Sequence, residues 1–256
     1  MPAYKLPRLF LTLIMSFIIS LSLVLSTSVQ AETLKLGIVN LHPHMFLDEN
    51  KQPRGAAIDY FNIVAKRMGL TDYEFEEYPL SRLVQRLEEA SLDAALFLAK
   101  NPKRELIFQY PKLPYSEIKS GIVVNSSSAL SQVSSGTDLS GFRIGTIQNS
   151  FVSPMLTKNK VELDPLPGIE APGKNLKKLA FNRLDAVYLP CYISITSEIT
   201  KLGMKDKFKV LNLPEPPIQI FTAFSPFVDS DLVKKYESVV YESDIELYKE
   251  LVEHYL

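Results

Sequence analysis

Segments with the hydrophobic pattern of strands alternate with segments that have the pattern of helices, and this alternation constrains the fold more than any other feature. Strand patterns lie at residues 34–39, 72–78 and 93–98. One helical pattern lies between Gly55 and Gly69, and another runs from Leu80 to Leu87. A strand–helix–strand order of this kind is typical of parallel sheets with right-handed crossover connections. The sequence therefore predicts an α/β fold.

A second round of the same kind begins after a strand pattern at residues 120–125 and a loop rich in serine and glycine. Further strand patterns lie at 142–147, 161–163, 185–189, 208–213 and 218–224, and helical patterns at 151–158, 175–182, 192–202 and 229–255. Two rounds of similar size predict two lobes, the first made of residues 32–120 with 222–256 and the second of residues 121–221. The hinge strands would lie near 121–125 and 218–224. The cleft between two such lobes is the default place for a ligand.

The first 31 residues have the three-part layout of a secretory signal peptide. Lys5 and Arg8 give a basic start, residues 9–25 are almost wholly apolar, and Ala31 ends a short polar segment as a signal peptidase requires. We expect cleavage after Ala31. The alternative is an uncleaved membrane anchor, because the apolar segment nearly reaches spanning length. No cysteine lies near this position, which excludes a lipid anchor on a mature N-terminal cysteine.

Charge and cysteine content narrow the class of protein further. The whole chain has 28 basic and 29 acidic residues, and loss of residues 1–31 removes two basic ones, so 26 against 29 gives a net charge of −3. That balance offers no electrostatic footprint for nucleic acid. Cys191 is the only cysteine, so no internal disulfide can form. An exported protein without disulfides fits a bacterial periplasm, and we expect a monomer there.

The segment Asn101–Tyr115 follows the third strand pattern and carries the most informative arginine. Asn101 stands where a helix N-cap would be, and Pro102 suits the first helical position. Arg104 then lies in a short capped turn that can direct its guanidinium beyond the carboxyl end of the strand, where open α/β sheets bind ligands. A guanidinium matches a carboxylate with two parallel hydrogen bonds and stays charged at any relevant pH. The alternative is a surface arginine that pairs with Glu105 or with solvent.

Several short motifs stand in one order over nearly all of the chain after residue 33. They are Leu34-Lys35-Leu36-Gly37, Gly55 with Asp59, Met68-Gly69-Leu70, Leu87 to Asp93-Ala94, Asn101-Pro102-Lys103-Arg104, Phe108 to Tyr115, Leu139 to Gly145, and Leu179 to Asp185-Ala186. Their order and spacing resemble the family-3 extracellular solute-binding proteins, the periplasmic receptors of polar amino-acid importers. The resemblance implies a two-lobed periplasmic-binding-protein type II fold, with mixed, mostly parallel sheets flanked by helices. It also implies that Arg104 holds a ligand's α-carboxylate and that an inner-membrane ABC permease is a partner.

The sequence departs from this family at positions that matter for the ligand. Relatives that bind amino acids place small hydroxyl residues on the strand before the arginine, whereas this chain has Phe97 and Ala99. The aspartate that takes the α-ammonium in relatives corresponds to Pro190. A buried ammonium without a carboxylate partner is costly. We therefore expect a small ligand with an acidic or polar acceptor group and an apolar or aromatic body, rather than a standard amino acid.

Other candidate site residues have equally simple structural explanations. Phe46 and Tyr115 could hold a flat or apolar group between them, or could pack in the core. Asn149 and Ser150 stand at a helix start, where free backbone N–H groups can hold an anion, or could act only as helix caps. The remaining candidates are Asn101 beside Arg104, Arg82, which could equally lie in solvent on its helix, and Tyr188 near Pro190.

Catalytic and metal motifs are weak in this sequence. His42 and His44 flank Pro43, but with no third ligand or cysteine pair nearby we predict no metal site and no cofactor. Nucleophile-elbow, zinc-protease and phosphate-loop motifs are absent from the sequence. We therefore expect a binding protein, either an importer receptor or a stand-alone sensor. The alternative is an enzyme on the same scaffold, a lyase similar to cyclohexadienyl dehydratase, for which Glu76, Glu77 or Asp185 would supply the carboxylate.

Overall fold

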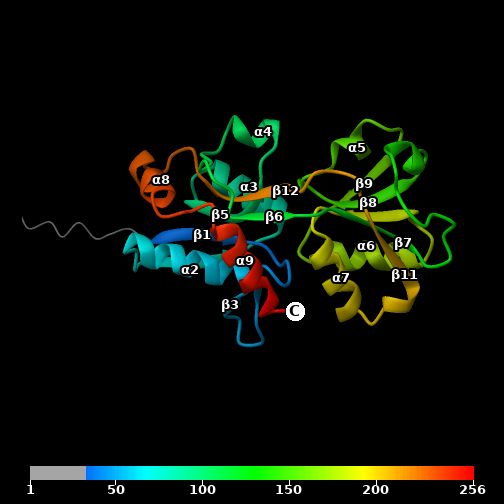
Figure 1. Ribbon diagram of the computed structural model, residues 1–256, viewed down its shortest axis with the longest axis horizontal. Helices are drawn as coiled ribbons and strands as arrows, with labels where there is room; N and C mark the ends of the chain where they lie inside the picture. Colours follow the sequence, from blue (N-terminus) through cyan, green and yellow to red (C-terminus); the bar gives the residue numbers. More distant parts are fainter. Residues whose placement is uncertain (1–32) are drawn as a thin grey trace, which may run out of the picture. The chain divides into compact units, whose positions relative to one another are not determined.

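The strands of the protein form two five-stranded sheets and a small two-stranded one in a computed structural model, which describes residues 33–256. The signal segment expected at residues 1–31 lies outside the described residues. The sheets and their flanking helices form an α/β fold, as predicted from the alternating patterns (Figure 1). Among the residues from Thr33 onward, no helix is both long and apolar enough to cross a lipid bilayer.

The first sheet has the strand order β4-β1-β5-β12-β6. These strands are β1 (Leu34–Ile38), β4 (Tyr73–Glu77), β5 (Ala94–Ala99), β6 (Ser116–Ile118) and β12 (Ile218–Phe224). Its helices are α2 (Ala56–Met68), α3 (Leu80–Glu88), α4 (Pro102–Glu105), α8 (Ser230–Glu237) and α9 (Asp244–Glu253), and the small sheet is β2 (Phe46–Leu47) with β3 (Pro53–Arg54). β1 pairs in parallel with β4 and β5, whereas β12 runs antiparallel to β5 and β6. We call this sheet with its helices the first lobe.

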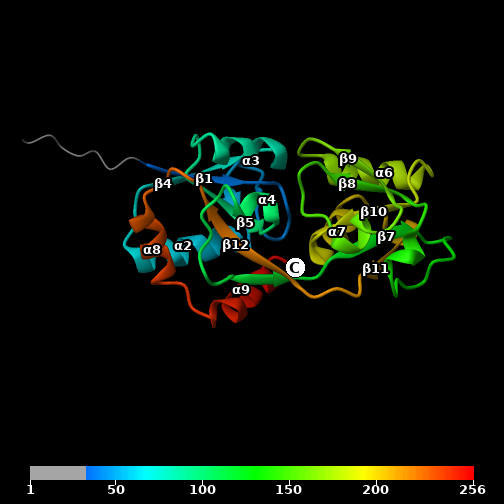
Figure 2. The same cartoon turned by 90° about the horizontal axis from the view of Figure 1, so that it is seen from above.

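The second sheet has the strand order β11-β7-β10-β8-β9. These strands are β7 (Gly121–Asn125), β8 (Arg143–Ile147), β9 (Glu162–Leu166), β10 (Ala186–Leu189) and β11 (Phe208–Asn212). Its helices are α5 (Pro154–Thr157), α6 (Ala171–Ala180) and α7 (Tyr192–Lys201), with short 3₁₀ turns η1 (Gly136–Leu139) and η2 (Lys205–Lys207). β10 is parallel to β8 and antiparallel to β7. We call this sheet with its helices the second lobe (Figure 2).

The chain crosses between the two sheets twice. β6 pairs in the first sheet and β7 in the second, so residues 119–120 make one crossing. β12 pairs along its length with β5 and β6 of the first sheet, so residues 213–217 make the other. The lobe boundary expected at residue 221 would therefore cut through β12, and the crossing before Ile218 is the better boundary. The strands expected as hinges belong to the sheets, and the connections beside them span the lobes.

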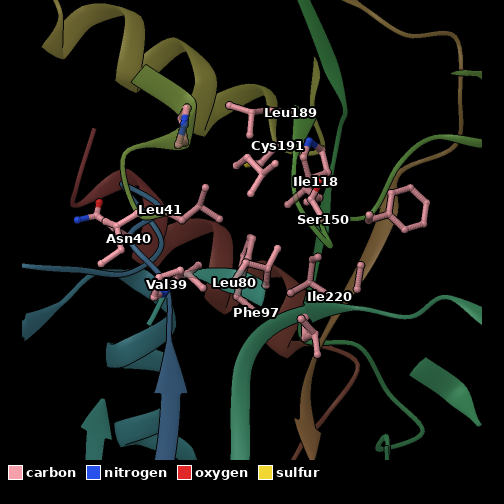
Figure 3. A pocket seen from close by; sticks show the side chains of 18 of the residues that line it. Val39, Asn40, Leu41, Leu80, Phe97, Ile118, Ser150, Leu189, Cys191 and Ile220 are labelled. Carbon is pink, nitrogen blue, oxygen red and sulfur yellow. The ribbon is translucent and has the colours of Figure 1, made fainter. Parts of the chain in front are cut away.

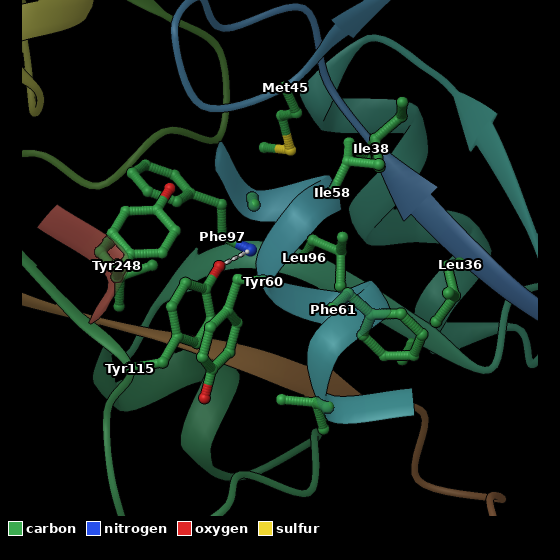
Figure 4. Close-up of a cluster of buried hydrophobic side chains, with 14 of the residues drawn as sticks. Leu36, Ile38, Met45, Ile58, Tyr60, Phe61, Leu96, Phe97, Tyr115 and Tyr248 are labelled. Atoms are coloured by element: carbon green, nitrogen blue, oxygen red, sulfur yellow. Dashed lines mark hydrogen bonds between the residues drawn. The ribbon is translucent and has the colours of Figure 1, made fainter. Parts of the chain in front are cut away.

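The core of the first lobe explains why α2 forms where the sequence pattern predicts it. Its apolar face buries Ile58, Phe61 and Val64 against the first sheet, and Gly69 ends the helix in the left-handed conformation (φ 66°). Figure 4 shows Leu36 and Ile38 of β1 close to Phe61 and Ile58 of α2. Burial of such side chains stabilises the fold by about 1.5–3 kcal/mol each.

The structure corrects three expected segments. The C-terminal residues 229–255 form two helices rather than one, because buried Asp244 at the start of α9 accepts hydrogen bonds from Arg67 Nη1 (2.8 Å), Tyr60 Oη (3.0 Å) and the Tyr241 N–H (3.2 Å). The strand expected at 161–163 extends through Pro165, which an edge strand such as β9 tolerates. The helix expected at 151–158 is only α5, because Ser153 caps it and Pro154 fixes its first position.

Candidate functional site

A cleft lined by both lobes lies beyond the carboxyl ends of β1, β5 and β10. Leu41, Phe97 and Ala99 line it from the first lobe, and Ile147 and Leu189 from the second. Figure 3 shows the labelled apolar side chains arranged around one space, with Leu189 and Cys191 on one side and Leu80 and Phe97 on another. The enclosed space is about 90 Å³, smaller than the roughly 300–1,000 Å³ of ordinary ligand pockets.

Arg104 lies at this cleft because the end of β5 is followed at once by the short helix α4. Asn101 caps α4, since its Oδ1 accepts a hydrogen bond from the Arg104 N–H at 2.8 Å. The side chain then turns back toward β5, and Nη1 donates to the Ala99 carbonyl at 2.9 Å. Nη2 donates to the Asn149 carbonyl of the second lobe at 2.7 Å. Arg104 is only 5% exposed, so it is not a solvated surface arginine.

Charge in the cleft is one-sided. Arg104 lines the cleft, and within the described residues 33–256 no aspartate or glutamate does. Both of its hydrogen-bond acceptors are neutral carbonyls, and burial lowers the pKa of Arg104 from its ordinary value. The guanidinium nevertheless stays protonated, since its ordinary pKa is so high. A buried charge is stabilised by an opposite charge in contact with it, and the described protein supplies none here.

Ser150 lies on the second-lobe side of the cleft, in the part that Arg104 also lines. It lines the cleft together with Arg104, and its Oγ is buried without a hydrogen-bond partner among the described residues. Asn149, with φ at 62°, presents its carbonyl to Arg104. Neither Asn149 nor Ser150 stands at the helix start expected from the sequence, because α5 begins at Pro154 with Ser153 as its cap. Asn101, Asn149 and Ser150 also line a neighbouring hollow of about 210 Å³ with Arg104, to which Lys103 and Glu88 contribute as well. The structure therefore brings Arg104, Asn101, Asn149 and Ser150 together.

The other four candidate residues lie elsewhere. Tyr115 is buried in the first lobe, where its ring stacks on Tyr60 and its Oη accepts a hydrogen bond from the Phe97 N–H at 2.9 Å (Figure 4). Phe46 packs against the rings of His42 and Tyr255 outside the cleft. Tyr188 is buried in the core of the second lobe. Arg82 is exposed on α3 and does not line the cleft.

The three positions at which a departure from amino-acid-binding relatives was expected all lie at the cleft. Phe97, Ala99 and Pro190 line it and contribute apolar surface there. Phe97, which lines the cleft from β5, has φ at 56°, and this value is unusual for a bulky residue on a strand. Sequence reasoning missed Leu41 and Ile169, which add further apolar surface from loops. The sequence offered one signal for both residues: each follows a strand, β1 for Leu41 and β9 for Ile169.

The carboxylates considered for a lyase do not meet in the cleft. Asp185 is exposed, and its Oδ2 accepts a hydrogen bond from the Arg143 N–H at 2.8 Å, which fixes the start of β8. Glu76 accepts a hydrogen bond from the hydroxyl of Tyr78. Neither Glu76 nor Glu77 lines the cleft. Among residues 33–256, no group of three or more histidine, cysteine, aspartate or glutamate side chains could hold a metal ion.

Known structures share this architecture. An ancestral arginine-binding protein bound to arginine is 20% identical, with a TM-score of 0.72, and the match covers 88% of this chain and 98% of that one. A histidine kinase sensor domain with similarity to periplasmic binding proteins is 17% identical, with a TM-score of 0.72 and coverage of 88% and 96%. The substrate-binding protein of an amino-acid ABC transporter is 17% identical, with a TM-score of 0.69 and coverage of 88% and 99%. At such identities the likeness establishes the periplasmic-binding-protein type II fold.

Sequence comparison identifies the family. No curated protein sequence gives a significant match to the chain. The family profile described as bacterial extracellular solute-binding proteins, family 3, matches residues 34–254. That range holds both lobes, both crossings and every candidate residue of the cleft. The chain therefore belongs to the bacterial extracellular solute-binding proteins of family 3.

Proposed function

We propose that this protein binds, in the cleft between its lobes, a small organic anion with an apolar or aromatic body and no ammonium group. Membership of a solute-binding family makes binding of a small molecule its function in general. The class of ligand follows from the cleft itself. One observation carries the proposal: Arg104 is buried at the cleft and no acidic side chain of the described residues lines the cleft with it.

The charge argument works in both directions. A carboxylate in the cleft would give Arg104 the opposite charge that its two carbonyl partners do not provide, and charge-assisted hydrogen bonds of this kind are the strong ones. An ammonium group would enter beside a guanidinium, with Pro190 at the position where the resemblance predicts an aspartate. Like charges in a poorly solvated site repel one another strongly. The cleft thus favours an anion over a zwitterion.

Ser150 would supply the second polar contact. Its buried Oγ has no partner among the described residues and lines the cleft with Arg104. A hydroxyl can donate one hydrogen bond to a carboxylate oxygen while the guanidinium holds the other. Apart from Asn40 and Tyr78 the remaining lining residues are apolar, so the rest of the ligand gains by leaving water. Burial of an aliphatic or aromatic body then adds to the affinity.

Binding would require the lobes to separate and close again. The enclosed space of about 90 Å³ is too small to admit a ligand of ordinary size. The Nη2 bond from Arg104 to Asn149 joins the lobes directly, and a ligand carboxylate could take over this donor. The two crossings at 119–120 and 213–217 are the natural hinges, because a few connecting residues can absorb such a motion.

We place the protein in the periplasm after cleavage of residues 1–31, either as the receptor of an ABC importer or as a stand-alone sensor. The family name supports an extracytoplasmic location. Importer receptors and sensor domains both occur among proteins of this fold. No aspartate or glutamate of the described residues lines the cleft, so an enzyme would have no catalytic carboxylate there. We therefore propose a binding protein rather than a lyase.

Native mass spectrometry of the protein purified from the cells that make it tests this function. We expect a retained molecule whose mass and fragmentation identify a carboxylic acid or other organic anion without an amine. A retained zwitterionic amino acid would contradict the proposal. Incubation of the identified compound with the protein, followed by mass spectrometry of the small molecule, would reveal turnover if the scaffold acts as an enzyme.

A further inference from the structure

A second contact between the lobes lies in the loop after β1, on the segment His42-Pro43-His44. His44 Nε2 lies 3.1 Å from Cys191 Sγ, at the residue before helix α7 of the second lobe. His42 Nδ1 lies 2.8 Å from Ser197 Oγ on the same helix. These pairs join residues 147 and 155 positions apart in the sequence. Two imidazoles of the first lobe therefore meet one helix of the second.

The first lobe holds the His44 ring in a fixed aromatic cage. The ring stacks on Phe97 of β5 with centroids 4.1 Å apart and on Tyr248 of α9 with centroids 5.8 Å apart. Nδ1 lies 2.8 Å from the Tyr248 hydroxyl. Figure 4 shows the rings of Phe97 and Tyr248 close to each other in the core of the first lobe. Only Nε2 remains to meet the second lobe, and His44 is 1% exposed.

The partners of His44 suit a neutral imidazole. A neutral ring has one donor and one acceptor, and both the Tyr248 hydroxyl and the Cys191 thiol can act in either role. A protonated ring would have two donors and no carboxylate in contact. Burial, with His42 nearby, holds the pKa of His44 at about 3, and burial raises the pKa of the Cys191 thiol. Buried in this way, the pair is uncharged at neutral pH.

Charged groups near this contact do not replace the missing carboxylate. The His44 side chain borders a second cavity, of about 560 Å³, and the charged residues that also line it are Glu117, Lys119, Lys249 and Glu253. Near His42, Lys201 and Glu198 of α7 have opposite effects on the His42 pKa, which burial lowers. Cys191 lines both this second cavity and the ligand cleft, so separation of the lobes would bring water to His44 Nε2.

We propose that His44 is an inter-lobe latch that joins Cys191 only as a neutral imidazole, so that protonation of His44 favours the open form of the protein. In the closed form the ring nitrogen is shielded by the second lobe. In the open form the same nitrogen faces water, which solvates the imidazolium. The proton and the second lobe therefore compete for one side of the ring.

The direction of the pH dependence follows from linkage. The pKa of His44 is depressed in the closed form, so this form keeps its full advantage above the ordinary histidine pKa of about 6.5. The advantage is lost progressively as the pH falls below that value. Acidification would thus open the lobes and release ligand, and a neutral medium would favour closure.

This inference rests on the proposed function only in requiring lobes that move, and it is tested without any ligand. Small-angle X-ray scattering of the protein between pH 8 and pH 5 measures the radius of gyration. We expect an increase as the pH falls below about 6.5. His44→Phe keeps an aromatic ring between Phe97 and Tyr248 but cannot be protonated, so its radius of gyration should not change over this range. His44→Gln serves as a second variant if the phenylalanine disturbs folding.

The chain offers matched controls, because it has only three histidines. His254→Gln, at an exposed position in the C-terminal segment, should retain the pH response of the parent protein. Histidine-detected NMR of the parent protein resolves three imidazoles and follows each through the titration. A radius of gyration that is the same at pH 5 and pH 8, or a response that survives in both His44 variants, would overturn the proposal. Loss of anion binding with the His44 response intact would contradict the proposed function alone.

Discussion

Arg104 and His44 are two basic side chains of the first lobe that are both buried and both contact the second lobe, yet burial has opposite consequences for them. Arg104 is 5% exposed and keeps its charge, because its ordinary pKa is far above any relevant pH. His44 is 1% exposed and loses its charge, because desolvation lowers its pKa to about 3. We therefore expect Arg104 to attract an anionic ligand, and His44 to keep its contact with the second lobe only while its imidazole is neutral.

If both proposals hold, the two contacts have different functions: Arg104 recognises the ligand, and His44 controls closure of the lobes. The acceptors of Arg104 are neutral carbonyls, which leave its positive charge uncompensated within the described residues of the cleft. The partners of His44 are a phenol and a thiol, which match a neutral ring completely. The predictions below test whether each side chain does what its surroundings imply, beginning with the largest effect.

Replacement of Arg104 by methionine should lower the affinity for the anionic ligand at least tenfold, measured by isothermal titration calorimetry. Removal of one partner of a buried charged pair costs about 2–5 kcal/mol. Methionine keeps most of the buried stem, so the change in melting temperature should be small. Arg82→Met, on exposed α3, is the matched control and should bind like the parent protein. An unchanged dissociation constant in Arg104→Met would remove Arg104 from the site.

Replacement of Pro190 by aspartate should reverse the preference of the cleft. The new carboxylate would supply Arg104 with a counter-charge inside the protein and repel an anion, while giving an ammonium group a partner. We expect the anion to bind several-fold more weakly and the corresponding amino acid to bind better than it does to the parent protein. Titration of both compounds against both proteins checks this. Equal loss for the two compounds would indicate damage to the cleft rather than a change of selectivity.

Replacement of Ser150 by alanine should weaken binding of the anion about tenfold or less, because the net contribution of one hydrogen bond is roughly 0.5–1.5 kcal/mol. Its Oγ has no protein partner in the described residues, so the free energy of unfolding should hardly change. Ser153→Ala gives a contrasting control, since Ser153 caps α5 and its loss should lower stability rather than affinity. An affinity unaffected by Ser150→Ala would place the ligand away from the second lobe.

Ligand affinity should also fall modestly from pH 7.5 to pH 5 in the parent protein and stay constant in His44→Phe. The sign follows from the depressed pKa of His44 in the closed form, whose advantage is present above about 6.5 and lost below it. A ligand with a pKa below 4 avoids titration of the ligand itself. Affinity that rises on acidification would contradict this account of the latch.

The fold could be predicted from the sequence because hydrophobic periodicity records which residues face a core. The face of α2 with Ile58 and Phe61, and the capping pair Asn101-Pro102 before Arg104, are local signals of this kind. The break between α8 and α9 escaped prediction because it depends on Asp244 meeting Arg67 and Tyr60, which are distant in the sequence.

The site could be predicted only in part, for a related physical reason. An arginine after a strand has few places to go, so Arg104 could be placed near the cleft from sequence alone. An aromatic residue packs equally well in a core or in a cleft, and Tyr115 and Tyr188 lie in cores. The contact of His44 with Cys191 joins the two lobes and leaves no local trace in the sequence.

Thermal-shift measurements on matched pairs of ligands test the central claim most directly. Each pair consists of an aliphatic or aromatic carboxylic acid and its 2-amino derivative, for example 3-phenylpropionate and phenylalanine. A ligand that binds the native state raises the melting temperature. We expect larger shifts for the amine-free acids, and loss of those shifts in Arg104→Met. Larger shifts for the amino acids would show that the cleft accepts an ammonium group and would contradict the account.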